Sequence, residues 1–160
     1  MADDFKRILV ATDGSDGATQ ALRRAVALAA SMRSALTVLT IFEPVEAEEI
    51  APLHDPEPRE FARVEHLQGA YAEAKEIMSE GILAEAKSIV SKFPGVNASF
   101  VFLEGDPVTQ ILWYADEISA DLIVMGRRGR SRLVGLLLGS VSQAVTGAAR
   151  QSVLLAPIGK

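Results

Sequence analysis

Three glycines and a serine near the end of the chain have a spacing that suits the binding of an anion. Gly126 and Gly129 are separated by two residues, and nine further residues lead to the pair Gly139-Ser140. Because glycine has no Cβ, it permits sharp turns and a close approach of the backbone to a bulky ligand. A helix that begins at the last pair would direct unpaired N–H groups and its dipole at a phosphate. The spacing therefore predicts a phosphate cradle.

Side chains in the same stretch could add to this cradle. Four arginines surround it, and their guanidinium groups match phosphate oxygens in charge and geometry: Arg127, Arg128, Arg130 and Arg132. The hydroxyls of Ser140 and Ser142 could either cap the following helix or donate to a phosphate oxygen. The sequence is compatible with both roles.

The elements expected to position these residues alternate between strand and helix. Short β-branched runs predict strands over residues 6–12, 35–42, 96–105, 121–126 and 152–157. Apolar residues spaced by three or four predict helices over about 18–32, 71–93, 107–118 and 140–149. The pattern indicates a single α/β domain, Rossmann-like, with a five-stranded parallel sheet covered by helices on both faces.

In such a sheet, ligands bind at the carboxyl ends of the strands, where the winding direction reverses. The loops after Thr12 and Met125 are the candidates. Asp13 stands in the first of these loops, before Gly14-Ser15. Its carboxylate could cap the first helix or accept hydrogen bonds from ribose hydroxyls.

Composition excludes several classes of protein. The chain has 160 residues, no cysteine and a net charge of −5, so disulfide and thiolate chemistry are excluded. The N-terminal apolar run is too short for a signal sequence or a membrane span. We therefore expect a cytoplasmic protein that does not associate with membranes. The arginines form a local cluster, which suits one small anion better than a nucleic acid.

One segment carries most of the acidity. Residues 43–66 contain eight acidic residues and two arginines, so the rest of the chain is close to neutral. This segment also contains four prolines, which argue against regular structure. We expect a mobile surface excursion beside the ligand-binding edge.

The stretch "MGRRGRSRLVGLLLGSVSQAV", together with "ILVATDGS" and "GDPVTQIL", resembles the universal stress protein family over almost the whole chain. In that family the glycine pattern marks members that bind ATP or a related adenine nucleotide. The resemblance also implies a homodimer, formed through the last strand from Ser152 to Pro157.

The resemblance further implies particular nucleotide-binding residues in this sequence. Ala11 and Thr12 would flank the base, Asp13 would lie near the ribose or adenine, and the backbone of Ile41 would meet the adenine edge. Met125 would end the fourth strand beside the nucleotide. The phosphates would contact Gly126, Arg128, Gly129, Gly139, Ser140, Val141 and Ser142.

Three functions remain open from the sequence. The first is a stress-response regulator that binds ATP without efficient hydrolysis, and any Mg or Mn would be carried by the phosphates. The second is a slow ATP hydrolase of the same fold, for which the sequence offers only Asp13 as an acid near the cradle and no Walker A motif. The third is a ligand-free interaction module, which would leave the glycine spacing unexplained.

Overall fold

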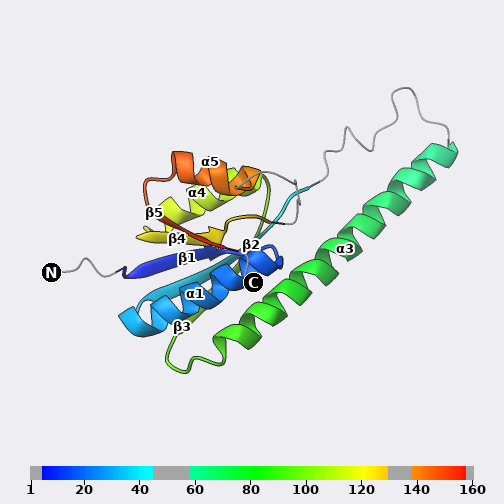
Figure 1. Ribbon diagram of the computed structural model, residues 1–160. Helices are drawn as coiled ribbons and strands as arrows, with labels where there is room; N and C mark the ends of the chain where they lie inside the picture. The colour runs from blue at the N-terminus through cyan, green and yellow to red at the C-terminus, as the bar shows by residue number, and fades with distance from the viewer. Residues whose placement is uncertain (1–4, 45–57, 130–137, 158–160) are drawn as a thin grey trace.

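The computed structural model describes residues 5–44, 58–129 and 138–157. It contains a five-stranded parallel sheet in the order β3-β2-β1-β4-β5, shown in Figure 1. The strands are β1 (Arg7–Ala11), β2 (Ala35–Phe42), β3 (Asn97–Glu104), β4 (Leu122–Gly126) and β5 (Ser152–Ala156). The helices within the described residues are α1 (Asp16–Met32), α3 (Pro58–Val90), α4 (Pro107–Glu117) and α5 (Ser140–Ala148). The predicted fold class is confirmed.

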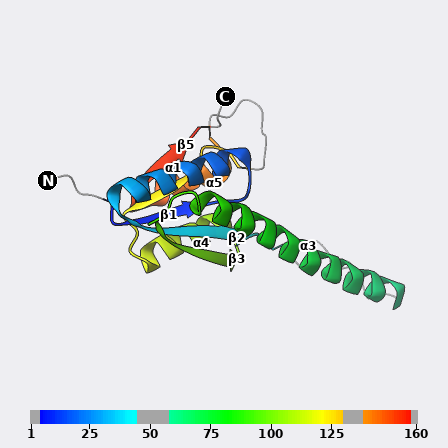
Figure 2. The ribbon, with the colours of Figure 1, turned by 90° about the horizontal axis from the view of Figure 1, so that it is seen from below.

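The sheet separates two layers of helices. Helices α1 and α3 cover one face and α4 and α5 the other, as Figures 1 and 2 show. Alternate residues of the central strand β1 enter the two cores: Ile8 and Val10 pack in the core under α1, whereas Leu9 packs under α4 and α5. Both faces of β1 are therefore buried, which explains its continuous apolar sequence.

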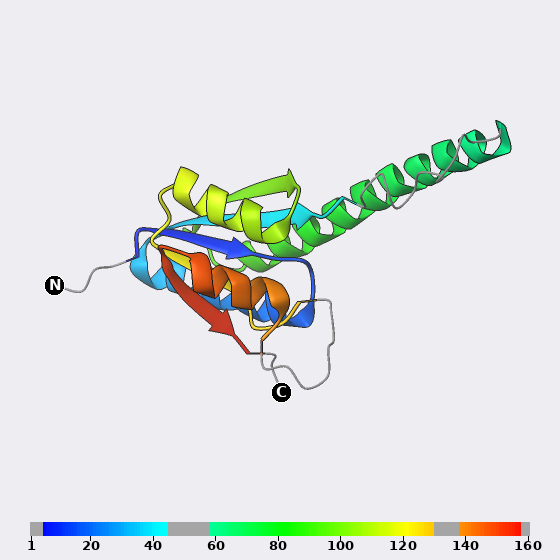
Figure 3. The same cartoon turned by 90° about the horizontal axis from the view of Figure 1, so that it is seen from above.

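The winding direction reverses between β1 and β4. From β1 the chain passes through α1 to β2, and from β4 it passes through α5 to β5 on the other side of the sheet. In Figure 3 the loops that follow these two strands diverge at the same end of the sheet. This is the switch point that the sequence predicts, and it leaves room for a ligand between the two loops.

Helix α3 is longer than the sequence analysis expects. It begins at Pro58 rather than near Tyr71, so the prediction of irregular structure is wrong for residues 58–66. Proline is tolerated in the first turn of a helix because no intrahelical bond depends on its missing N–H. Residues 45–57, the remainder of the expected excursion, lie outside the described residues. Among the α3 side chains whose burial the structure describes, those of the C-terminal turns contribute to the core, through Ile82, Ala86 and Ile89.

The N-terminal part of α3 extends away from the sheet (Figures 1 and 2). Ile77, a few residues before the buried turns, is largely exposed. Across the described ranges, no helix combines the length and the hydropathy that membrane spanning requires.

Candidate functional site

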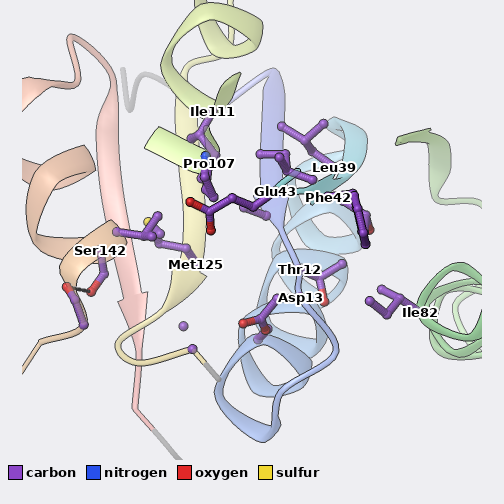
Figure 4. A pocket seen from close by; sticks show the side chains of 18 of the residues that line it. Thr12, Asp13, Leu39, Phe42, Glu43, Ile82, Pro107, Ile111, Met125 and Ser142 are labelled. Atoms are coloured by element: carbon purple, nitrogen blue, oxygen red, sulfur yellow. Dashed lines mark hydrogen bonds between the residues drawn. The ribbon is translucent and has the colours of Figure 1, made fainter. Parts of the chain in front are cut away.

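A cavity of about 480 Å³ opens at the carboxyl edge of the sheet, a volume typical of small-molecule sites. In Figure 4, Met125, Pro107 and Ile111 lie on one side of the cavity and Ile82 of α3 lies on the other side. Thr12 and Asp13 lie between these two sides. All twelve predicted site residues line it, from Ala11 to Ser142. The structure therefore brings together residues from three separate parts of the chain.

The loop after β1 fixes the position of Asp13. Its Oδ1 accepts a hydrogen bond from the Ser15 N–H (3.0 Å), and Gly14 has a φ of 76°, which glycine adopts readily. The N-cap of α1 is Ser15, whose hydroxyl accepts from the Ala18 N–H. Asp13 is thus not the cap of the first helix. Its carboxylate instead orders the loop and lines the cavity.

The glycines of the motif have different structural roles. A Cβ on Gly126 would lie 2.7 Å from the carbonyl carbon of Gly17, so this glycine is required by the close approach of α1. Gly126 also lines the cavity, so the expectation that it makes room for a ligand stays a prediction. A Cβ on Gly129 would instead lie 2.7 Å from Asp13 Oδ2. Gly129 therefore allows the two loops of the switch point to meet.

Gly139 is the N-cap of α5 and has no side chain to cap it. Its φ of −74° is accessible to any residue, so it is not required for conformational reasons. The first intrahelical bond runs from the Gln143 N–H to the Gly139 carbonyl. The N–H groups of Ser140, Val141 and Ser142 precede that bond, and helix N-termini of this kind attract anions.

Ser142 orders the helix start. Its hydroxyl is within hydrogen-bond distance of two carbonyl oxygens, that of Arg127 (2.8 Å) and that of Gly139 (2.9 Å), and the residue is only 2% exposed. Of the two roles that the sequence leaves open for this hydroxyl, the structure shows contacts with the backbone, and the phosphate contact of Ser142 stays a prediction. We call the segment from Gly126 to Gly139 the glycine loop. The Gly139 N–H also donates to the Arg127 carbonyl, so one carbonyl connects the two ends of this loop.

Arg128 brings a positive charge to the cavity. It lines the cavity, and its buried Nε has no hydrogen-bond partner among the described residues. The same holds for the buried Nε of Arg127. A buried donor without an acceptor destabilises the protein, and a bound anion could accept a hydrogen bond from it and remove this penalty. Arg130 and Arg132 lie outside the described residues.

The backbone of Ile41 faces an open position in the sheet. Pairing between β1 and β2 ends at Ala11 and Leu39, and the last bond runs from the Thr12 N–H to the Leu39 carbonyl. In a parallel ladder, alternate residues direct both backbone groups to the same neighbour. Ile41, two residues after Leu39, therefore presents its N–H and C=O to the space that β1 has left.

Sequence reasoning missed the cavity residues that surround this motif. They come from the ends of β2 and β3, from α1 and α3, and from the start of α4: Ala18, Leu39, Thr40, Phe42, Glu43, Met78, Ser79, Ile82, Phe102, Pro107 and Ile111. Because ligands bind at the carboxyl ends of parallel strands, the positions of the residues from β2, β3 and the start of α4 could have indicated them. The α3 residues have no such signal, because only the packing of that helix brings them to the edge.

Glu43 is a second acidic residue at the cavity, besides Asp13. It lines the cavity at the end of β2, and its side chain reaches into the cavity in Figure 4. The sequence predicts Asp13 as the only carboxylate near the phosphate cradle, and this prediction is wrong because Glu43 lines the same cavity. Among the described residues, no three His, Cys, Asp or Glu side chains gather into a metal-binding group.

A doubly wound α/β domain with a cavity at its switch point defines a class of ligand-binding proteins. Residues 4–157 match the universal stress protein family. The chain belongs to this family.

Similar proteins align over nearly their whole length. The stress response protein NhaX of Bacillus subtilis is 30% identical over 164 residues, which cover 93% of this chain and 96% of NhaX. A universal stress protein of Thermus aquaticus is 38% identical over 152 residues, covering 94% and 98% of the two chains. A universal stress protein solved in complex with cAMP has a TM-score of 0.66 and 27% identity, covering 98% of this chain and 100% of that one.

Proposed function

We propose that the protein is a stress-response regulator that binds an adenine nucleotide, ATP in particular, without efficient hydrolysis. The observation that carries this proposal is the continuity of one cavity from the open backbone of Ile41 to the N-terminus of α5. The first end suits a base and the second a phosphate. The cAMP complex of a similar protein supports an adenine nucleotide as the ligand.

The base would bind beside β2. The N–H and C=O of Ile41 form a donor and acceptor pair, which complements the acceptor and donor on the Watson–Crick edge of adenine. Apolar side chains line this part of the cavity from both faces of the sheet: Leu39, Ile111 and Met125 from the α4 side, and Ile82 and Phe102 from the α3 side. Asp13, in the loop after β1, would then lie within reach of ribose hydroxyls.

The phosphates would bind at the glycine loop. Three N–H groups at the start of α5 and the Arg128 guanidinium would provide the donors. Any Mg or Mn would be carried by the phosphates, with Asp13 and Glu43 as the carboxylates of the cavity. The same two carboxylates are the candidates for positioning water in the alternative function, slow hydrolysis.

We also propose a homodimer formed through β5. This strand lies at the edge of the sheet, and an unpaired edge favours pairing with another strand. The Arg127 N–H donates to the Ala156 carbonyl, so the backbone groups of Ala156 are directed to β4. Alternate residues of a parallel strand bond to the same neighbour, so the backbone groups of Val153 and Leu155 point outward, away from β4. Two copies could pair along this edge.

Native mass spectrometry of freshly purified protein tests the ligand, and titration calorimetry with ATP, AMP and cAMP ranks the candidates. We expect a retained adenine nucleotide and an increase in stability of about 2.7 kcal/mol when ATP exceeds its Kd a hundredfold. An empty protein with no thermal shift in millimolar ATP and magnesium would contradict the proposal. Phosphate release near 1 per second, an ordinary enzymatic rate, would favour the hydrolase instead.

A further inference from the structure

The hydroxyl of Thr40 is a buried polar group that the motif does not explain. Thr40 is 2% exposed, and its Oγ1 has no hydrogen-bond partner in the part of the chain that the structure describes. Such hydroxyls are uncommon, because burying one without a partner costs free energy. The only other described side-chain atoms in this condition are the Nε atoms of Arg127 and Arg128. Thr40, like Arg128, lines the cavity.

The position of Thr40 in β2 places its side chain on the face of the sheet that α3 covers. Its neighbours Leu39 and Ile41 pack in the core under α4 and α5, so Thr40 projects to the opposite side. The register pairs Thr40 with Phe102 of β3. Met78 and Ile82 of α3 complete this side of the cavity.

Two aromatic side chains, Phe42 and Phe102, line this side of the cavity, and both contact side chains of α3. Phe42 packs edge-to-face against Tyr71 of α3, with ring centroids 5.1 Å apart. The Nζ of Lys75 lies 5.9 Å from the ring centroids of both Phe42 and Phe102, and the same group pairs with Glu104. The rings are therefore fixed before any ligand binds.

Aromatic and apolar walls around the Thr40 hydroxyl, with Ser79 of α3 as a further hydroxyl in the lining, suit a flat heterocycle rather than a phosphate. A base can stack or pack against such walls, and its nitrogens can accept from the hydroxyl. A phosphate would lose hydration there without gaining a cation from the lining, since Arg128 is in the glycine loop on the other side of the switch point. The chemistry of this side therefore favours the base.

We propose that the Thr40 hydroxyl hydrogen-bonds to the base of the bound nucleotide and is a specificity-determining group of the site. The inference rests on the proposed function and adds a side-chain contact to the backbone contacts of Ile41. The unpartnered hydroxyl of the free protein acquires its partner when the nucleotide binds.

Titration calorimetry of Thr40→Val with adenosine and with ATP tests the inference, because valine keeps the shape of threonine and removes only the hydroxyl. We expect both ligands to bind about tenfold more weakly, which corresponds to one hydrogen bond. Thr40→Ser, which keeps the hydroxyl, should bind as the wild type does. Thr37→Val, in the same strand, provides the control, since Thr37 Oγ1 contacts Ser99 Oγ (3.1 Å) away from the cavity; its affinity should not change.

Thermal unfolding of the free variants separates this role from a structural one. Because the hydroxyl has no partner in the free protein, Thr40→Val should have the same melting temperature as the wild type or a higher one. Unchanged affinity for both ligands, a loss confined to ATP, or a melting temperature several degrees lower would each overturn the inference while leaving nucleotide binding intact. If the wild type binds neither ligand, the proposed function itself fails and the inference with it.

Discussion

The Ser142 hydroxyl lies 2.8 Å from the carbonyl oxygen of Arg127 and connects the first turn of α5 to the start of the glycine loop. The same carbonyl accepts from the Gly139 N–H. These contacts hold the N–H groups of the helix start in one orientation without any ligand. Preorganised donors bind an anion more tightly, since less order has to be created on binding.

Ser142→Ala should lower both stability and ATP affinity. The loss of a buried hydrogen bond costs about 1 kcal/mol, which for a domain of this size lowers the melting temperature by about 3 °C. Ser140→Ala is the matched control for stability, because Ser140 is exposed in the same turn. Differential scanning fluorimetry with and without ATP measures both effects. Equal behaviour of the two variants would show that the Ser142 hydroxyl does not order the loop.

Gly126→Ala should destabilise the fold by about 1–3 kcal/mol, as overpacking does. The new methyl group would lie 2.7 Å from the Gly17 carbonyl carbon, which is backbone and cannot rotate away. For Gly139→Ala the nearest atom is 3.5 Å away, so this control has no overpacking, only the smaller cost of alanine at an N-cap, and should be the more stable of the two variants. Urea denaturation midpoints measure the difference. A Gly126→Ala midpoint equal to that of Gly139→Ala would contradict the role assigned to Gly126.

Arg128→Ala should weaken ATP binding by about ten- to a hundredfold and adenosine binding much less. A charge-assisted hydrogen bond to a phosphate contributes about 1.5–3 kcal/mol, and adenosine has no phosphate. Arg150→Ala is the control, because the Arg150 side chain is 87% exposed beyond the other end of the sheet. Calorimetry with both ligands gives the ratio. Equal losses for ATP and adenosine would argue against a phosphate contact.

Val153→Pro should yield a monomer, because proline removes an N–H that β5 directs outward and leaves the bonds to β4 in place. Val153→Ala, which loses packing but keeps the N–H, should remain dimeric. Light scattering after size exclusion gives the masses. A wild-type monomer at micromolar concentration would rule out the proposed dimer.

Asp106 should make α4 sensitive to acid. Hydrogen bonds from the Thr109 hydroxyl and N–H lower the pKa of the Asp106 carboxyl below its ordinary value, against a small opposing effect of burial. Its folded pKa is lower than its unfolded pKa, so the added stability is present above about pH 4 and is lost as the pH falls through the folded pKa. Asp106→Ala should therefore destabilise by about 1 kcal/mol at pH 7 and by less near pH 2.5.

Thermal unfolding of wild type and Asp106→Ala at both pH values measures this difference. Asp116→Ala is a suitable control, because Asp116 lies near the other end of α4. A wild-type advantage that is as large at pH 2.5 as at pH 7 would show that the charge of Asp106 contributes nothing.

The strands and three of the helices could be predicted because their signals are local, whereas several of the twelve cavity residues, Ile41 among them, followed only from the family resemblance. The run from Ala35 to Phe42 forms β2 with the expected bounds, since a short β-branched segment has few alternatives. The sequence does not predict the start of α3 at Pro58, because the prolines before residue 66 indicate irregular structure. Proline forbids a helix interior but not a first turn, and sequence patterns distinguish these two positions poorly.

The sequence by itself determined the succession of strands and helices along the chain, the edge of the sheet where the cavity lies and the spacing of the glycines, because these depend on residues that are close in the chain. Only the tertiary structure decided that Gly126 serves the packing of α1, that Glu43 joins Asp13 in the cavity and that Thr40 is buried with no partner among the described residues. Each of these depends on which distant segments meet. Such contacts arise from the packing of α1 and α3 against the sheet and leave no periodic pattern in the chain.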